Sequence, residues 1–528
     1  MTTLIKNVQV IDGTGKAPFK GDVLLRDRTI VAMGSFPNYQ ADKIVHGNEG
    51  YLCPGFIDVN ASSDRYLSLF TSPLHSNFLK QGVTTITVGQ CGFSLAPTWY
   101  GSLKYFSNWA YTNTVNSNWR TTKEFLDTLE HSFSFGVNIA TLAGHKVIRE
   151  DIIKDPREWR SLSANELRIF RNILKESLDQ GAFGFSTGLG YVPYQHTTAY
   201  ELRALVDVVA RAKGVYATHV RDEKSDLLAS VQEAIRIAKE TSVRTIINHL
   251  RPFIGYESIF DQAFAYLQDK AHESPIYFST NPFAYSVVPL DSLLPDHLKY
   301  MGRAEFQAQL QDPSTVKKLT QSLPKMQAKD TTIVHTQNAP FLNGVSLYDF
   351  ARHRQLSANK AFIELLKITN GKGLLFYENL NQEVINRTLL SPQALIASNS
   401  PGIDEGAVCY PHGTSGAFEQ SRESCQLYNT GVYPQRARET FSIFLKKMSQ
   451  SSSVSLESAV ARITGTPARV LGLSKRGVIQ SGAYADLTLL SRDLEPVQVW
   501  VNGTLVVEEG QLIAKKQVSY GSILRKSI

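Results

Sequence analysis

The chain has 528 residues, of which 42% are hydrophobic and 20% are charged, the composition of an ordinary soluble globular protein. Its formal net charge is +7, but Lys and Arg are spread along the chain without a basic run, so we expect no nucleic-acid partner. Four cysteines are too few for a disulfide framework in this length, and no uncharged apolar run reaches the roughly 18 residues of a membrane helix. Because the N-terminus also lacks a signal-peptide pattern, we expect a cytoplasmic protein without a membrane partner.

The two ends of the chain share a pattern of short β segments. Residues 1–54 contain LIKNVQVID and DVLLRDRTIVAMG, and residues 476–528 contain ADLTLLSRD and VQVWVNGTLVVEEG. We predict that these two ranges form one small β-sandwich. Residues 55–475 are then expected to form a separate domain between them.

Short apolar strands alternate with helical segments through this middle range. The predicted strands are GFIDV, VTTITVG, VNIATLAG, AFGFSTG, GVYATHV, RTIINHL, SPIYFST and ALIASNS. Eight parallel strands separated by helices are typical of a closed (β/α)8 barrel. The predicted fold class is therefore α/β, a TIM-like barrel with a small β-sandwich.

Two segments interrupt the alternation of strands and helices. Residues from about 290 to 350 are helical and amphipathic, so we interpret them as an insertion or lid. Residues 409–435, CYPHGTSGAFEQSRESCQLYNTGVYPQ, are rich in Gly and Ser and predict a loop on the catalytic face.

Three predicted strands end in side chains that bind metals well: Cys91, His219 and His249. The carboxyl ends of barrel strands meet at one face, so these side chains can converge on one point. Three N and S ligands suit a catalytic Zn²⁺, and we predict one such site. Each residue alone is more often a buried filler or a hydrogen-bonded core residue, and that alternative stays open.

Other polar residues stand near the same strand ends. The first strand ends at Asn60 and Ser62, and the last ends at Asn399. His145 follows the third strand, where it suits either substrate contact or a structural role. Arg251 lies two residues after His249 and suits either a ligand carboxylate or a salt bridge.

At these residues the sequence resembles the N-acyl-D-amino-acid deacylases (D-aminoacylases) of the amidohydrolase superfamily. The resemblance runs from VQVIDGTGKAPFKGDVLLRDRTIVAMG through QGVTTITVGQCGFSLAP, GAFGFSTGLGYVP and YATHVRDE to GVIQSGAYADLTLL, so it covers nearly the whole chain. It implies a β-sandwich plus barrel and hydrolysis of the acyl amide of an N-acyl-D-amino acid. It also implies that Cys91, His219 and His249 hold the tightly bound zinc ion.

Several positions depart from the family pattern. The resemblance places the two histidines of a second metal site at Asn60 and Ser62, and the general acid/base Asp at Asn399. We therefore expect one zinc site, a lost second site and a disabled proton transfer, because an Asn amide does not titrate near neutral pH. Losing a positioned general base costs roughly 10²–10⁴ in rate. A motif after the next strand also has Ser279 for Asp and Phe283 for Tyr.

The sequence leaves alternative functions open. The first is an amidohydrolase that cleaves a non-peptide acyl amide with one zinc-bound water at impaired activity, using Asp222, Glu223 or His145 as the base. The second is a non-catalytic paralogue that retains a metal and a small-ligand pocket, and a third is a structural protein. For the first two we expect a small-molecule partner bearing an N-acyl group and a carboxylate, which Arg251, at the family's Lys position, would bind.

Overall fold

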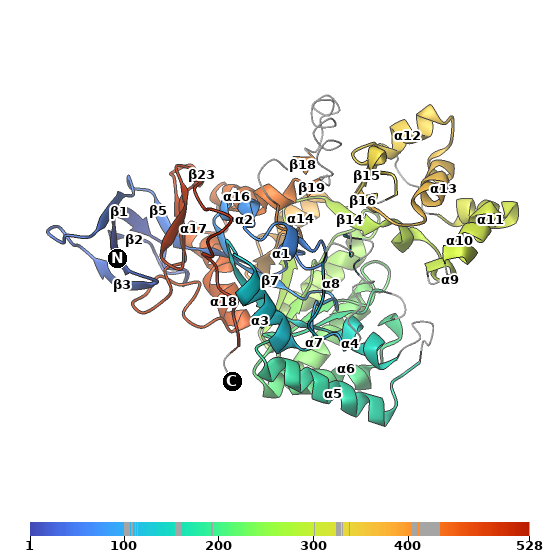
Figure 1. The fold of residues 1–528 in the computed structure, drawn as a ribbon, viewed down its shortest axis with the longest axis horizontal. Coiled ribbons are helices and arrows are strands. Elements are labelled where there is room, and N and C mark those ends of the chain that lie inside the picture. The colour runs from blue at the N-terminus through green and yellow to red at the C-terminus, as the bar shows by residue number, and fades with distance from the viewer. Residues whose placement is uncertain are drawn as a thin grey trace.

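The structure is a computed structural model. It describes residues 1–526 except 100–105, 107–108, 111, 113–114, 154–159, 192–193, 300, 302, 324–328, 330, 337, 404–408 and 411–432. Figure 1 shows a central α/β unit with a β-sheet layer at one end and a helical extension at the other. Most of the loop predicted at residues 409–435 lies outside the described residues.

Parallel strands form the centre of the molecule. One sheet has the order β6–β7–β8, and a second has the order β17–β13–β12–β11–β10–β9, with every neighbouring pair parallel. The strands are β6 (Phe56–Asp58), β7 (Val83–Val88), β8 (Asn138–Thr141), β9 (Ala143–Gly144), β10 (Gly184–Gly188), β11 (Val215–His219), β12 (Arg244–Ile247), β13 (Ile276–Thr280) and β17 (Ala394–Ile396). They coincide with the eight strands predicted from the sequence, with β8 and β9 sharing one position.

Backbone hydrogen bonds join the two sheets at both edges. Only Leu142 separates β8 from β9, and the N–H of Phe183, just before β10, donates to the carbonyl of Thr141 at the end of β8 at 2.9 Å. At the other edge the N–H of Asn399 donates to the carbonyl of Asn60, and the N–H of Ser62 donates to the carbonyl of Ser400, both at 2.9 Å. The eight strand positions therefore close into the predicted barrel.

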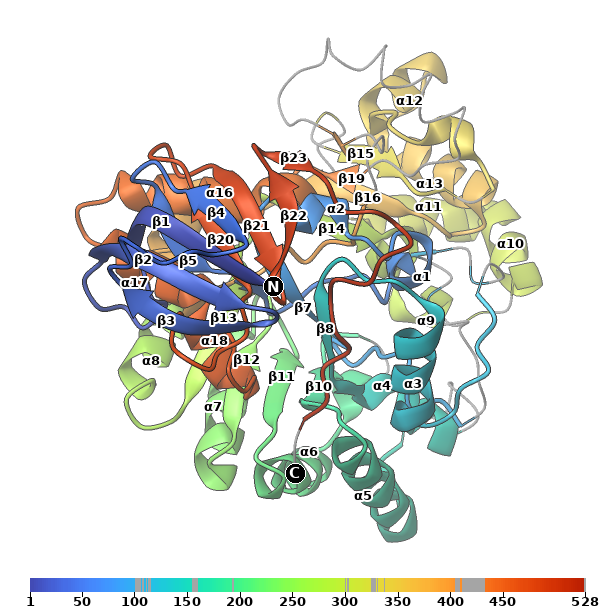
Figure 2. The same cartoon turned by 60° about the vertical axis from the view of Figure 1, so that its left-hand side comes forward.

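Amphipathic helices cover the outside of the barrel, as Figure 2 shows. In α5 (Ala164–Asp179) the buried residues Leu167, Phe170, Leu174 and Leu178 recur every three or four positions, which puts them on one face. Ser163 begins this helix by accepting a hydrogen bond from the N–H of Glu166, whose carboxylate bonds back to the cap. The other outer helices include α6 (Ala199–Arg211), α7 (Leu227–Thr241) and α8 (Glu257–Lys270).

Both ends of the chain enter one sheet, on which the predicted β-sandwich is built. Its order is β23–β22–β21–β20–β5–β1–β2–β3, and β4 pairs with β1. The strands are β1 (Thr2–Val10), β2 (Phe19–Arg26), β3 (Thr29–Gly34), β4 (Lys43–His46), β5 (Tyr51–Pro54), β20 (Leu487–Leu490), β21 (Pro496–Val501), β22 (Thr504–Glu508) and β23 (Gln511–Leu512). Antiparallel pairing of β20 with β5 joins the two ends, whereas the domain limits at residues 54 and 476 stay predictions.

The segment after β13 forms an extension with its own apolar core. Its helices are α9 (Asp296–Lys299), α10 (Arg303–Gln311), α11 (Pro313–Ser322), α12 (Leu347–His353) and α13 (Ala358–Thr369). They adjoin an antiparallel sheet of β14 (Tyr285–Pro289), β16 (Leu374–Glu378) and β15 (Thr331–Val334), which the sequence did not predict. No helix among the described residues is both long and apolar enough to cross a membrane.

A buried polar network joins the terminal sheet to the barrel. The Arg476 guanidinium pairs with the Asp486 carboxylate, and the two side chains are 4% and 3% exposed. The side-chain amide of Asn138, on β8, donates to Asp486 at 3.1 Å, and that of Asn502 donates to Asn138 at 2.9 Å. Because these groups satisfy one another away from water, losing one leaves a buried charge without its partner.

We expect Asp486→Ala to lower the free energy of unfolding by about 3–5 kcal/mol, because it leaves Arg476 charged and unpaired in the interior. The matched control is Glu495→Ala, which breaks the half-exposed ion pair with Lys446 and is expected to cost about 0–1 kcal/mol. Denaturant titrations of the two variants measure both effects. Equal losses of stability would contradict a role for the network in holding the two units together.

Candidate metal centre

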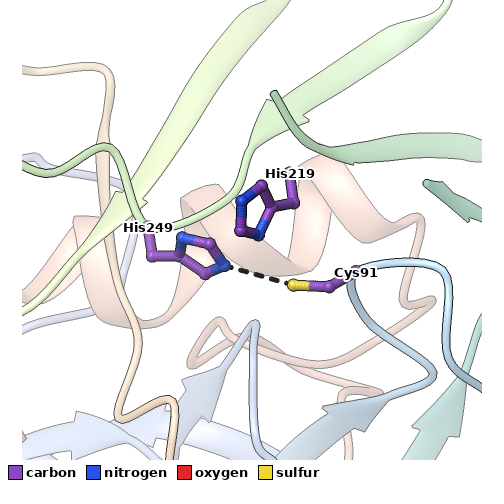
Figure 3. Close-up of side chains that lie close together, drawn as sticks. All are labelled: Cys91, His219 and His249. Carbon is purple, nitrogen blue, oxygen red and sulfur yellow. Dashed lines mark hydrogen bonds between the residues drawn. The ribbon is translucent and has the colours of Figure 1, made fainter. Parts of the chain in front are cut away.

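Three side chains predicted as zinc ligands converge at the carboxyl ends of barrel strands. Cys91 follows β7, His219 is the last residue of β11 and His249 follows β12. One ligand atom from each lies within 4.8 Å of the others, and all three residues are buried. Sγ of Cys91 lies 3.2 Å from Nε2 of His249, and the His219 ring stands beside both (Figure 3). Among the residues that the structure describes, this is the only such cluster.

The backbone at this centre is held in an unfavourable conformation. The φ angles are 55° at Cys91, 38° at His249 and 45° at Asn399, in the left-handed region that residues other than Gly rarely adopt. Strained backbone of this kind persists where the surrounding structure enforces it and is concentrated at functional sites. The surrounding barrel therefore holds the backbone at these three strand ends in an uncommon conformation, as is found at functional sites.

The charges around Cys91 favour its thiolate. Burial by itself raises the pKa of the Cys91 thiol, but the Arg65 guanidinium, His249 and hydrogen bonds from both histidines bring the pKa well below its usual value. Burial likewise opposes a charge on His219, yet the carboxylate of Glu223 raises the His219 pKa to about 9. Thiolate and imidazole are the ligands zinc prefers, and the three ligand atoms lie within 4.8 Å of one another. The residues present fit a zinc ion.

Glu223 is the one carboxylate that the structure places against the two histidines, among the residues it describes. Its Oε2 lies 3.3 Å from Nε2 of His219, and its Oε1 lies 3.4 Å from Nδ1 of His249. Arg251 donates to both oxygens of the same carboxylate. Burial by itself raises the Glu223 pKa, but the charges of Arg251 and His219 bring the pKa well below its usual value. A carboxylate that accepts from a ligand imidazole fixes its tautomer and orientation.

The other two candidate bases lie away from the three ligands. Asp222 accepts hydrogen bonds from the backbone N–H groups of Lys224 and Asp226, so its side chain caps its own loop. His145 is fully buried at the start of α4 (His145–Ile152), where its Nε2 lies 2.9 Å from Oε1 of Glu201. The structure therefore does not bring His145 to the centre as a base or a substrate contact.

The substituted positions lie together on the seam of the barrel. The Ser62 hydroxyl donates to Oδ1 of Asn399 at 3.2 Å, so the amide nitrogen of Asn399 is directed elsewhere. The Asn60 side chain is fully buried, and neither of its polar atoms has a hydrogen-bond partner among the described residues. Ser279, which stands at a family Asp position, accepts from the N–H of His249 at 2.8 Å and so supports a ligand residue.

A small recess opens beside His249 on the same face. Its enclosed volume is about 10 Å³, and its lining includes His249, Arg251, Phe283, Asn399 and Arg436. No sequence pattern points to Arg436, because it starts α16 (Arg436–Ser449) after a long Gly- and Ser-rich segment whose path cannot be inferred from spacing. Four positions named from the sequence thus share this recess with one that was missed.

A closed α/β barrel with thiolate and imidazole groups at its strand ends has the architecture of a metal-dependent hydrolase. Comparisons with known proteins show what this chain is similar to. Residues 430–511 match the model of the amidohydrolase family. An N-acyl-D-aspartate deacylase of Alcaligenes xylosoxydans xylosoxydans is 25% identical over 525 residues, which cover 95% of this chain and 91% of that protein. A D-aminoacylase of the same organism is 25% identical over 490 residues, covering 92% and 87% of the two chains.

Solved structures agree with the fold. The crystal structure of an N-acyl-D-glutamate deacylase from Bordetella bronchiseptica, complexed with zinc and a phosphonate inhibitor, has a TM-score of 0.78 and 23% identity, with 99% of each chain covered. A D-aminoacylase structure has a TM-score of 0.77 and covers 99% of each chain, also at 23% identity. The resemblance to the N-acyl-D-amino-acid deacylases of the amidohydrolase superfamily is therefore confirmed.

Proposed function

We propose that this chain is a zinc-dependent amidohydrolase related to the N-acyl-D-amino-acid deacylases, that it holds one metal ion, and that its hydrolysis of acyl amides is impaired. The observation that carries the proposal is the convergence of Cys91, His219 and His249 beside a seam that has no titrating side chain at positions 60, 62 and 399. The proposed ligand is a small molecule with an N-acyl group and a carboxylate, as in the substrates named for the similar deacylases. The proposed location is the cytoplasm.

In such a reaction the residues of this chain would hold the metal, but none of those at the centre is a good proton acceptor. Cys91, His219 and His249 would hold the zinc ion, and zinc when bound supplies Lewis-acid chemistry for amide hydrolysis. Asn399 can donate or accept a hydrogen bond but cannot take up a proton near neutral pH. Glu223 is held by Arg251 in a bidentate ion pair, which stabilises the carboxylate and makes it a weak base. A proton acceptor is therefore the missing part.

The alternative is a non-catalytic paralogue that keeps the metal and a small-ligand pocket. The hydrogen bond from Ser62 to Asn399 favours it, because this bond ties two of the substituted side chains to each other. The enzyme and the non-catalytic paralogue both require the metal centre, and they differ only in whether the protein turns over a substrate.

Turnover of a panel of N-acetyl-D-amino acids, measured on protein of known zinc content, tests the proposal. We expect the wild-type chain to turn over roughly 10²–10⁴ times more slowly than the triple variant Asn60→His, Ser62→His, Asn399→Asp, which restores the titrating groups. A slow but zinc-dependent rate supports the enzyme, and none at all supports the non-catalytic paralogue. Wild-type turnover equal to or faster than that of the metal-loaded triple variant would refute the impairment.

Glu223 provides a test that does not depend on turnover. We expect Glu223→Gln to weaken zinc binding about 10–100-fold, because the variant loses the carboxylate that orients His219 and His249. Competition with a chromophoric chelator measures this affinity. Asp222→Asn is the matched control, since its side chain lies one position away and retains an oxygen that accepts the loop hydrogen bonds. Wild-type affinity in Glu223→Gln would contradict the orienting role.

A further inference from the structure

Two guanidinium groups line the recess beside His249, that of half-buried Arg251 and that of buried Arg436, and their charges are balanced differently. Arg251 donates from Nε to Oε1 of Glu223 at 3.0 Å and from Nη2 to Oε2 of the same carboxylate. Its remaining nitrogen, Nη1, lies 3.4 Å from the Ser286 hydroxyl. The positive charge of Arg251 is therefore already paired inside the protein. This pairing corresponds to the salt-bridge alternative considered from the sequence.

Arg436 has no such partner. Its side chain donates from Nη2 to the carbonyl of Asn399 at 2.8 Å and from Nε to the Ser400 hydroxyl at 3.2 Å, and its guanidinium lies 5.4 Å from the centre of the Tyr285 ring. These three groups are neutral. Arg436 is only 4% exposed, and no described residue forms an ion pair with it. Burial lowers its pKa, but a guanidinium remains charged in proteins.

A carboxylate near Arg436, that of Asp58, makes its hydrogen bonds to other groups. Asp58 interacts with Arg436 electrostatically, but its carboxylate accepts hydrogen bonds from the N–H groups of Asn60 and Ser398 instead. Burial raises the Asp58 pKa to about 6, so this carboxyl is still largely ionised near neutral pH, but its hydrogen bonds go to those two N–H groups and not to Arg436. A buried charge without a partner costs several kcal/mol, and an anionic ligand would remove that cost.

The groups around Arg436 suit an anion. None of the described residues accepts a hydrogen bond from its Nη1. Because Oδ1 of Asn399 accepts from Ser62, the donor end of that amide is free to face the recess. An ionised Asp at position 399 would repel an anion, whereas Asn does not. Arg436 is also the first residue of the 14-residue helix α16, whose N-terminus adds partial positive charge.

We propose that Arg436, rather than Arg251, recognises the carboxylate of the ligand, with the side-chain amide of Asn399 as a second donor. The recess of about 10 Å³ has room for about one water molecule, which one carboxylate oxygen would replace. This proposal rests on the proposed function for its ligand class, an N-acyl compound with a carboxylate. It places that carboxylate at position 399, on the seam of the barrel.

Calorimetric binding of N-acetylglycine and of its neutral analogue N-acetylglycinamide tests the proposal, using full-length zinc-loaded protein. We expect the wild-type chain to prefer the acid by about tenfold or more, since a charge-assisted pair of hydrogen bonds is involved. Arg436→Gln is expected to reduce the preference to about twofold or less, and Arg436→Lys to retain part of it. Asn399→Asp is expected to weaken the acid about tenfold and to leave the amide unchanged.

The matched control is Arg462→Gln, which removes another buried guanidinium that donates to backbone carbonyls but does not line the recess, and it should keep the preference for the acid. Circular dichroism verifies that each variant is folded. No preference in the wild-type chain, a preserved preference in folded Arg436→Gln, or its loss in folded Arg462→Gln would each overturn the proposal. Turnover is not needed for this measurement, so an inactive protein that still prefers the acid would refute only the enzymatic part of the proposed function.

Discussion

The closure of the barrel depends on a few backbone hydrogen bonds between the ends of its first and last strands. Asn399 donates to Asn60, and Ser62 donates to Ser400, through main-chain atoms alone. The buried carboxylate of Asp58 accepts from the backbone N–H of Ser398 across the same seam, and also from that of Asn60 on its own side. Because the seam does not use the side chains at positions 60, 62 and 399, these can change without opening the barrel.

On the function proposed above, this separation of fold from chemistry would let the chain keep one metal centre while the seam side chains change. The Cys91, His219 and His249 side chains come from strands away from the seam, and two of them sit on backbone with positive φ. Their hydrogen bonds and the Glu223 carboxylate form an arrangement that is complete without the seam residues. Loss of titrating groups at the seam therefore affects proton transfer more than metal binding.

Much of this arrangement can be predicted from the sequence, because it depends on the spacing of apolar residues and on the order of strands and helices along the chain. Eight apolar strands alternating with helices predict the barrel, and parallel strands bring their carboxyl ends to one face, so the three ligands could be named. His145 follows a strand in the same way, but it begins a helix, and its ring packs on Phe170 and bonds to Glu201. The strand pattern predicts that a residue lies at a strand end, but it does not predict the direction of its side chain.

Pairing between charged side chains is harder to predict. Spacing gives no means of choosing between Asp222 and Glu223, which differ by one position, yet only Glu223 contacts the histidines and Arg251. Arg436 lies beyond a long segment without regular spacing, so its approach to Asn399 is a property of the tertiary fold. The strands of the helical extension were missed for a related reason, since antiparallel partners there are separated by helices.

Zinc stoichiometry tests the central claim most directly. Equilibrium dialysis against increasing zinc, followed by elemental analysis, counts the ions bound per chain. A single tight ion, lost in Cys91→Ser, is the result that one retained metal centre and a neutral seam predict. Two tight ions in the wild-type chain, or one that persists unchanged in Cys91→Ser, would contradict this account.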